Sequence, residues 1–507
     1  MSKRFWWVFA VSGGLLLGLS FPPLPFPWLA WMALLPLLWV IKHCDWRQSA
    51  VAAFVAHVIA YLAAGYWVML HPDPYTRWAS AAGIVWLAVL STIPWTVAAR
   101  ARTRIRRLLW LFAGIGSVEM FQLYSDLGFP WLLLGHTQAA FEPFNQLAEL
   151  GGVTGLSMWI VGINIAIWSV IDRWHQTKWI VVAVLVLLIA IPAVTGSVRL
   201  EQTNSEVDEA NEVKVVGIQP ALAVRSWRVA EDASRVDSLQ VITDRLLEAA
   251  GLRPSEVNLI IWPETTIPPT NLSDAAGRQF VRDLQRSWHT SLLSGAIELV
   301  PSSNGSPFRN AVVFIRGDST VISLYRKRRL VPFAEHVPYS DLFPVLRRLA
   351  VPAGGVWGYE AGNHPGLFTL GDKTKIGTMI CFESVFGYLS RELSRAGASL
   401  LVVVTQDGWW GDSFGYRQHV AFTRLRAIET GLPIVQVAAT GVSARINRRG
   451  HIEGALDWME RGALVATVRP HRVETLYIEL GDWPGELSVI LALFLILSAR
   501  FTKSRTE

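Results

Sequence analysis

The sequence has few cysteines and few charged residues. Only Cys44 and Cys381 occur among 507 residues, and we expect them on opposite sides of a membrane, which excludes a disulfide framework. A lone thiol in an oxidising compartment is chemically vulnerable, so Cys381 needs an explanation of its own. Charged residues make up 17% of the chain and apolar residues 51%. Together with a mean hydropathy of +0.33, this composition predicts a membrane component.

Patterns typical of metal, phosphate or nucleic-acid sites are also missing. His136, His336 and His419 have no metal-ligand spacing to cysteines or carboxylates. The sequence has no glycine-rich phosphate loop, so we expect neither a metal nor an organic cofactor. The net charge is +6, but much of the basic excess lies beside apolar runs. Membrane topology therefore explains it better than a nucleic-acid partner does.

Eight apolar runs approach the length needed to cross about 30 Å of hydrocarbon. They cover residues 5–20, 27–41, 50–70, 80–98, 108–124, 155–171, 178–196 and 483–500. The first run could be a signal peptide, but no small-residue cleavage pattern follows it and six more spans do. We expect it to stay as a membrane anchor. Glu119 lies in the fifth run, where an ionisable side chain is costly, and its role is left open.

Lysines and arginines in short loops set the expected orientation. They are Lys42, Arg47, Arg100, Arg102, Arg104, Arg106, Arg107, Arg173, Lys178, Arg500, Lys503 and Arg505. The alternate loops hold almost none. By the positive-inside rule both termini are cytoplasmic. We therefore expect a membrane domain of seven transmembrane helices at 1–196, an extracytoplasmic domain at 197–482, and a C-terminal transmembrane helix with a cytoplasmic tail at 483–507.

The segment 197–482 has a different pattern. Short, branched apolar runs predict strands at 213–218, 259–262, 291–297, 311–315, 376–380 and 400–404. Amphipathic stretches such as 230–250 lie between several of them. Strands that alternate with helices predict an α/β domain.

Three segments of this domain carry candidate catalytic residues. Cys381 ends a predicted strand at a turn, a geometry that exposes a nucleophile near backbone N–H groups and that favours the thiolate. A buried cysteine acting as a small hydrophobe is the alternative. Glu264 follows an apolar strand and could be a general base to a thiol. Lys327 could stabilise an oxyanion and lower the thiol pKa, or belong to a solvated basic run at 326–329.

These segments resemble the apolipoprotein N-acyltransferase family of the carbon-nitrogen hydrolase (nitrilase) superfamily. The matching motifs are Phe129-Pro-Trp-Leu, Trp262-Pro-Glu264, Tyr325-Arg-Lys327, Leu330-Val-Pro-Phe-Ala-Glu335, Ile380-Cys381-Phe-Glu383 and Asp407-Gly-Trp-Trp-Gly-Asp412. The resemblance covers nearly the whole chain. It implies a membrane α-helical bundle of about eight transmembrane helices joined to an α/β domain built as an αββα sandwich.

The resemblance also implies roles for individual residues. Cys381 is the acylated nucleophile, Glu264 the base and Lys327 the cation that faces the oxyanion. The residues implied in support are Glu335, Glu383, Phe382 and, near the acyl-chain entrance, Trp227. An exposed glutamate is more often a solvated charge, however, and Trp227 could be an interfacial anchor.

The implied location is the bacterial inner membrane, with the catalytic domain on the periplasmic side. The implied partners are a glycerophospholipid acyl donor in the bilayer and the S-diacylglyceryl-cysteine of an apolipoprotein as acceptor. Gln406, Ala439 and Thr440 depart from the family pattern, so acceptor choice or rate could differ. A membrane-anchored amidase and a non-catalytic lipoprotein-binding protein are the alternatives.

Overall fold

The chain folds into two compact units, which we describe separately. One consists of Met1–Val68, Trp78–Glu201 and Glu479–Glu507, and the other of Met69–Arg77 and Gln202–Ile478. The computed structural model describes residues 5–72, 74–172, 178–202, 212–222, 233–284, 288–300, 308–317, 321–340, 342–343, 345 and 358–504.

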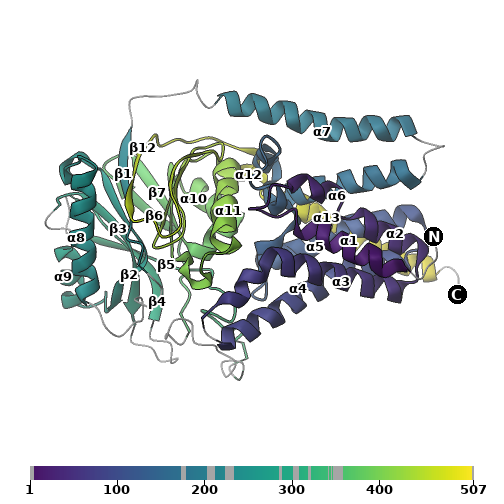
Figure 1. The fold of residues 1–507 in the computed structure, drawn as a ribbon, viewed down its shortest axis with the longest axis horizontal. Helices are drawn as coiled ribbons and strands as arrows, with labels where there is room; N and C mark the ends of the chain where they lie inside the picture. Colours follow the sequence, from purple (N-terminus) through teal and green to yellow (C-terminus); the bar gives the residue numbers. More distant parts are fainter. Residues whose placement is uncertain are drawn as a thin grey trace. The chain divides into compact units, whose positions relative to one another are not determined.

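The first unit is helical (Figure 1). Its α-helices are α1 (Trp6–Gly18), α2 (Leu35–His43), α3 (Trp46–Gly65), α4 (Pro74–Arg100), α5 (Arg104–Tyr124), α6 (Ala148–Asp172), α7 (Lys178–Glu201) and α13 (Trp483–Ser504). Side-chain caps begin two of them: Asp45 accepts from backbone N–H groups at the start of α3, and Thr103 does so for α5. Backbone angles at Gly151 and Gly152 kink α6.

Each expected apolar run overlaps a helix, although the run at 27–41 is divided. There a short 3₁₀ turn, Pro27–Trp31, precedes α2, and a proline stands in the first turn of both. Within the described residues, four segments are long and apolar enough to cross a membrane by length and composition: Trp46–Leu70, Thr76–Arg100, Phe144–Asp172 and Trp179–Glu201. The number of spans remains a prediction.

The second unit contains two sheets, each of six strands among the described residues. One has the order β12-β1-β2-β3-β4-β5 and the other β11-β10-β9-β8-β7-β6. The strands are β1 (Val213–Gln219), β2 (Leu259–Thr270), β3 (Ser291–Leu299), β4 (Phe308–Ile315), β5 (Ile322–Arg326), β6 (Gly366–Leu370), β7 (Thr374–Ile380), β8 (Leu400–Thr405), β9 (Ile434–Ala438), β10 (Ser443–Ile446), β11 (Ile452–Leu456) and β12 (Gly462–Val468).

Helices cover the outer faces of the two sheets. α8 (Ala233–Ala249) contacts β2 and β12, whereas α10 (Gly387–Arg395) and α11 (Phe414–Thr430) contact β7 and β9 of the other sheet. Figure 1 shows α8 and α9 (Ala275–Asp283) on one side of the strands and α10 and α11 on the other. The two sheets contact each other through β1 and β2 against β8 and β9. The αββα sandwich expected from the sequence is therefore confirmed.

The central strands run in parallel: β1, β2 and β3 in one sheet, and β7, β8 and β9 in the other. All six residues of β8 are buried, as expected for a parallel strand covered on both faces. β2, which carries Glu264, and β7, which Cys381 follows, belong to different sheets, so the packing of the two sheets against each other brings these candidate residues together.

Candidate active site

Cys381 follows β7 directly and opens the 3₁₀ turn η12 (Cys381–Val385). Its φ of 50° lies in the left-handed region, which costs an L-residue about 1–2 kcal/mol. The side chain is 8% exposed. The turn at the end of the strand agrees with the sequence analysis, and the strained backbone is of the kind that functional sites retain.

Glu264 lies within β2, where the pairing with β3 shifts register between Trp262 and Ile267. The strand was expected to end near Glu264, but after this irregularity it continues to Thr270. Gly295 on β3 accommodates the irregularity, because a Cβ at that position would lie 2.5 Å from the Glu264 Cα. At this irregularity the Glu264 carboxylate faces Asn310 on β4, Lys327 directly after β5 and Gln406 directly after β8.

Two hydrogen bonds and one ion pair fix the buried Glu264 carboxylate. Its Oε1 accepts from Asn310 Nδ2 at 2.8 Å, and its Oε2 accepts from the Gln406 backbone N–H at 2.8 Å. Lys327 Nζ lies 3.5 Å from Oε1. Three segments that are far apart in sequence therefore hold this side chain.

Lys327 is buried, with a side chain only 1% exposed. Its Nζ donates to Glu335 Oε1 at 2.9 Å. The neighbouring arginines pair elsewhere, Arg326 with Glu298 and Arg328 with Glu392. Lys327 therefore does not belong to a solvated basic run, and the surface alternative considered for it is wrong.

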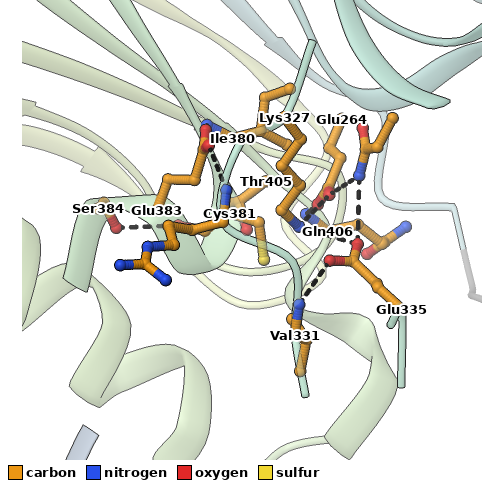
Figure 2. Close-up of polar contacts among 12 residues, drawn as sticks. Glu264, Lys327, Val331, Glu335, Ile380, Cys381, Glu383, Ser384, Thr405 and Gln406 are labelled. Atoms are coloured by element: carbon orange, nitrogen blue, oxygen red, sulfur yellow. Dashed lines mark hydrogen bonds and ion pairs between the residues drawn. The ribbon is translucent and has the colours of Figure 1, made fainter. Parts of the chain in front are cut away.

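Glu335 joins the same cluster from the turn after Lys327. Its Oε2 accepts from the Val331 backbone N–H at 2.9 Å, and Asn310 Nδ2 lies 3.4 Å from its Oε1. Asn310 thus contacts both carboxylates that flank the Lys327 ammonium group. Figure 2 shows the side chains of Glu264, Lys327, Glu335 and Cys381 converging on one region.

Glu383 is buried and does not belong to the solvated class considered for it. Its two oxygens accept from the Tyr325 hydroxyl at 2.7 and 2.8 Å. They also accept from the backbone N–H groups of Arg328 and Ile380, at 2.7 and 2.8 Å. Arg328 directly follows Lys327, and Ile380 directly precedes Cys381. The Glu383 carboxylate therefore links the two backbone segments that carry Lys327 and Cys381 by hydrogen bonds. Phe382, also buried, packs edge-to-face on Phe386.

We expect Glu383→Gln to lower both stability and activity. A glutamine offers one acceptor oxygen, and its NH₂ group would face backbone donors, which leaves at least one buried N–H unpaired. Such a loss costs about 1–3 kcal/mol. The apparent melting temperature should fall, and the acylation rate should fall because the Lys327 and Cys381 backbones lose their common anchor. Glu392→Gln is a matched control, since Glu392 pairs with the Arg328 side chain and is more exposed. Equal effects of the two substitutions would contradict the anchoring role.

Burial decides the protonation of the cluster. It raises the pKa of the Cys381 thiol well above its ordinary value, and the charge of Glu264 raises it further, against the lowering effect of Lys327. Burial also raises the pKa of Glu264, although Lys327 opposes this. Lys327 therefore lowers the pKa of the Cys381 thiol, as expected, but burial outweighs this effect and the net pKa of the thiol is raised.

Several residues around the cluster were missed by the sequence analysis. Asn310 on β4 stands in an ordinary strand pattern, so no sequence signal marks it. Tyr325 on β5 was named only as part of a matching motif and was given no role. Thr440 and Gln406 were noted only as departures from a family pattern. In the structure the Thr440 hydroxyl donates to Gln406 Oε1 at 2.8 Å, so these two departures contact each other.

Trp227 lies outside the described residues. Among those that are described, no group of three or more His, Cys, Asp or Glu side chains could hold a metal ion. The arrangement instead offers a buried thiol, a carboxylate able to accept its proton, and a lysine ammonium group beside both.

Comparisons with known proteins identify the family of the chain. The family model for carbon-nitrogen hydrolase matches residues 215–477, and the model for the apolipoprotein N-acyltransferase N-terminal domain matches residues 13–166. Among solved structures, Nit3 of Saccharomyces cerevisiae, a member of branch 10 of the nitrilase superfamily, gives a TM-score of 0.40 at 15% identity, over 51% of this chain and 90% of that one.

Curated relatives align over nearly the whole chain. A protein of Geobacter metallireducens named apolipoprotein N-acyltransferase is 30% identical, over 94% of this chain and 92% of its own length. A protein of the same name from Chlorobaculum tepidum is 29% identical, over 99% of this chain and 98% of its own. The chain therefore belongs to the apolipoprotein N-acyltransferase family, and its α/β unit is a carbon-nitrogen hydrolase domain.

Proposed function

We propose that the chain is an N-acyltransferase that moves an acyl chain from a membrane glycerophospholipid, through a thioester on Cys381, to the N-terminal amine of S-diacylglyceryl-cysteine on apolipoproteins. The observation that carries the proposal is the buried Glu264, Lys327 and Cys381 cluster in a chain of this family. Such a cluster can form and discharge a thioester without a cofactor.

In the first half-reaction the Cys381 sulfur attacks the ester carbonyl of the phospholipid. Glu264 accepts the thiol proton as the C–S bond forms, because the raised pKa of Cys381 disfavours a free thiolate. The carbonyl oxygen becomes an oxyanion, and the Lys327 ammonium group stabilises it. The C–O bond then breaks, and the lysophospholipid alkoxide leaves with the proton held by Glu264.

In the second half-reaction the neutral amine of the acceptor attacks the thioester carbonyl. The C–N bond forms, Glu264 accepts the amine proton, and the C–S bond breaks. The proton returns to the sulfur, so the thiol is restored and an amide is released. The Lys327 charge stabilises both half-reactions, because the negative charge develops on the oxygen of the same acyl carbonyl group each time.

The setting of this chemistry is a membrane, and the apolar helices of the first unit agree with a membrane protein. We propose the bacterial inner membrane, with multiple spans and the catalytic unit on the periplasmic side. The positive-inside distribution of lysine and arginine supports this orientation. Trp227 is proposed to lie near the acyl-chain entrance.

The acceptor decides between an acyltransferase and a hydrolase. Protein loaded with labelled phospholipid and then separated from the donor should discharge rapidly onto a diacylated lipopeptide with a free N-terminal amine. The N-acetylated lipopeptide is the matched control and should leave the enzyme loaded, because its nitrogen has no nucleophilic lone pair. Equal discharge by both lipopeptides, or equally fast discharge by water, would favour the membrane-anchored amidase.

A pH profile tests the pairing of Glu264 with Glu335. The pKa of Glu264 is raised by burial and, less strongly, by the charge of Glu335. Glu264 must be ionised to accept a proton, so activity should be lost as the pH falls through this raised pKa. Glu335→Gln removes the charge that raises it, so the acid limb of kcat/KM should move to lower pH. A limb that stays in place, or moves to higher pH, contradicts the assignment of Glu264 as the base.

A further inference from the structure

A buried histidine contacts the backbone of the nucleophile. His419 on α11 is 1% exposed, and its Nε2 lies 3.0 Å from the carbonyl oxygen of Cys381. On the other side of the ring, Nδ1 lies 2.8 Å from Oδ1 of Asp407, which also accepts from the Thr405 hydroxyl at 2.8 Å. Neither contact involves the Cys381 sulfur, and the proposed reaction steps do not use His419.

The two contacts determine the protonation of the ring. A backbone carbonyl has no hydrogen to donate, and an ionised aspartate only accepts hydrogen bonds. Each ring nitrogen of His419 therefore faces an acceptor, and a proton on both nitrogens satisfies both contacts. The Ser384 hydroxyl, 2.7 Å from Nε2, can accept from that nitrogen or donate to it. In the neutral ring one nitrogen lone pair would point at a carbonyl or carboxylate oxygen, which is repulsive. The geometry favours an imidazolium paired with the Asp407 carboxylate, because the Ser384 hydroxyl can then accept from Nε2 while it donates to the Cys381 carbonyl.

We infer that His419, as this buried imidazolium, is a positioning residue that holds the Cys381 carbonyl and so keeps the nucleophile in its left-handed conformation. The Ser384 hydroxyl also donates to this carbonyl, at 3.1 Å, and lies 2.7 Å from His419 Nε2. A charge-assisted hydrogen bond is stronger than a neutral one, so His419 is the main tether. This inference rests on the proposed function only for its effect on acyl transfer.

The imidazolium also balances a charge near the thiol. The groups that act on His419 include Asp407, the Cys381 backbone carbonyl and the Ser384 hydroxyl, which contact the ring, and Glu264, which acts through its charge. Burial is the largest single effect on the pKa of His419 and lowers it, but the charge of Asp407, the hydrogen bonds to Asp407 and to the Cys381 backbone, and the charge of Glu264 together outweigh burial, so the net pKa is raised. Asp407 raises the pKa of Cys381. Without a cation at position 419, the uncompensated carboxylate would make the thiol still harder to ionise.

Three variants separate the tether from the charge. His419→Gln keeps one neutral donor but no charge, His419→Leu keeps neither, and Asp407→Asn combined with His419→Gln removes both charges of the pair. His451→Gln is the matched control, because His451 is exposed and outside the cluster. Alkylation of Cys381 by iodoacetamide, followed by mass spectrometry of the Cys381 peptide, needs neither phospholipid nor lipoprotein. A negative alkylation result would therefore contradict the role of His419 without bearing on whether the protein is an acyltransferase.

We expect the alkylation rate to fall about 100-fold in His419→Leu, the effect of misplacing a reacting group, and less in His419→Gln. The pH profile of alkylation should move to higher pH in His419→Gln and return toward wild type in the double variant. Should His419→Leu fail to fold, the other two variants decide. If folded His419→Gln is alkylated at the wild-type rate and with the wild-type pH profile, His419 neither positions Cys381 nor affects its thiol through a charge, and the inference is wrong. A double variant with the profile of His419→Gln would overturn the imidazolium.

Discussion

Replacing Cys381 by alanine should abolish acyl loading and lower acyl transfer by roughly 10⁴-fold or more, as removal of a catalytic nucleophile does in other enzymes. Phospholipid alone should load the wild-type protein, because a ping-pong enzyme forms its acyl-enzyme without an acceptor. Cys381→Ser should load poorly at best, since a hydroxyl is far harder to deprotonate than a thiol. Mass spectrometry of the Cys381 peptide after incubation with labelled phospholipid measures the adduct.

Cys44 provides the matched control for this experiment. It is the only other cysteine in the sequence, lies at the end of α2, and should be dispensable. Cys44→Ala should therefore load and transfer at the wild-type rate. Label that persists in Cys381→Ala, or label on Cys44, would rule out the proposed thioester.

Replacing Lys327 by methionine should lower the loading rate by about 10²–10³-fold, the effect of removing one oxyanion-stabilising group. Methionine nearly preserves the side-chain volume but removes the charge and the hydrogen bond to Glu335. Loading at close to the wild-type rate would contradict the role of Lys327 at the oxyanion.

The structure adds an effect on stability. Lys327 is the cation between the buried carboxylates of Glu264 and Glu335. Removing one partner of a buried ion pair costs about 3–5 kcal/mol. We therefore expect Lys327→Met to lower the apparent melting temperature. Adding Glu335→Gln to it should restore much of the melting temperature, because one buried carboxylate is neutralised, but should not restore loading. Joint recovery of stability and loading would show that Lys327 acts only through folding.

Local sequence determined much of this protein. Apolar runs marked the helices of the first unit, and short branched runs marked the strands of the second, because both signals depend only on neighbouring residues. The positions of Glu264, Lys327 and Cys381 beside predicted strands, within motifs that resemble a family, identified the candidate catalytic residues. Their neighbours in sequence also located Glu335 and Glu383, although not what these two side chains contact.

Only the tertiary structure decided how these groups are held and whether they carry protons. The Glu264 carboxylate accepts from a backbone N–H 142 residues away, and Glu383 ties the residue after Lys327 to the residue before Cys381. His419 faces two acceptors that lie on other elements. A pKa depends on burial and on charges brought close by folding. Residue spacing contains neither quantity, which is why the sequence predicted that Lys327 lowers the pKa of the Cys381 thiol but not that burial outweighs this effect.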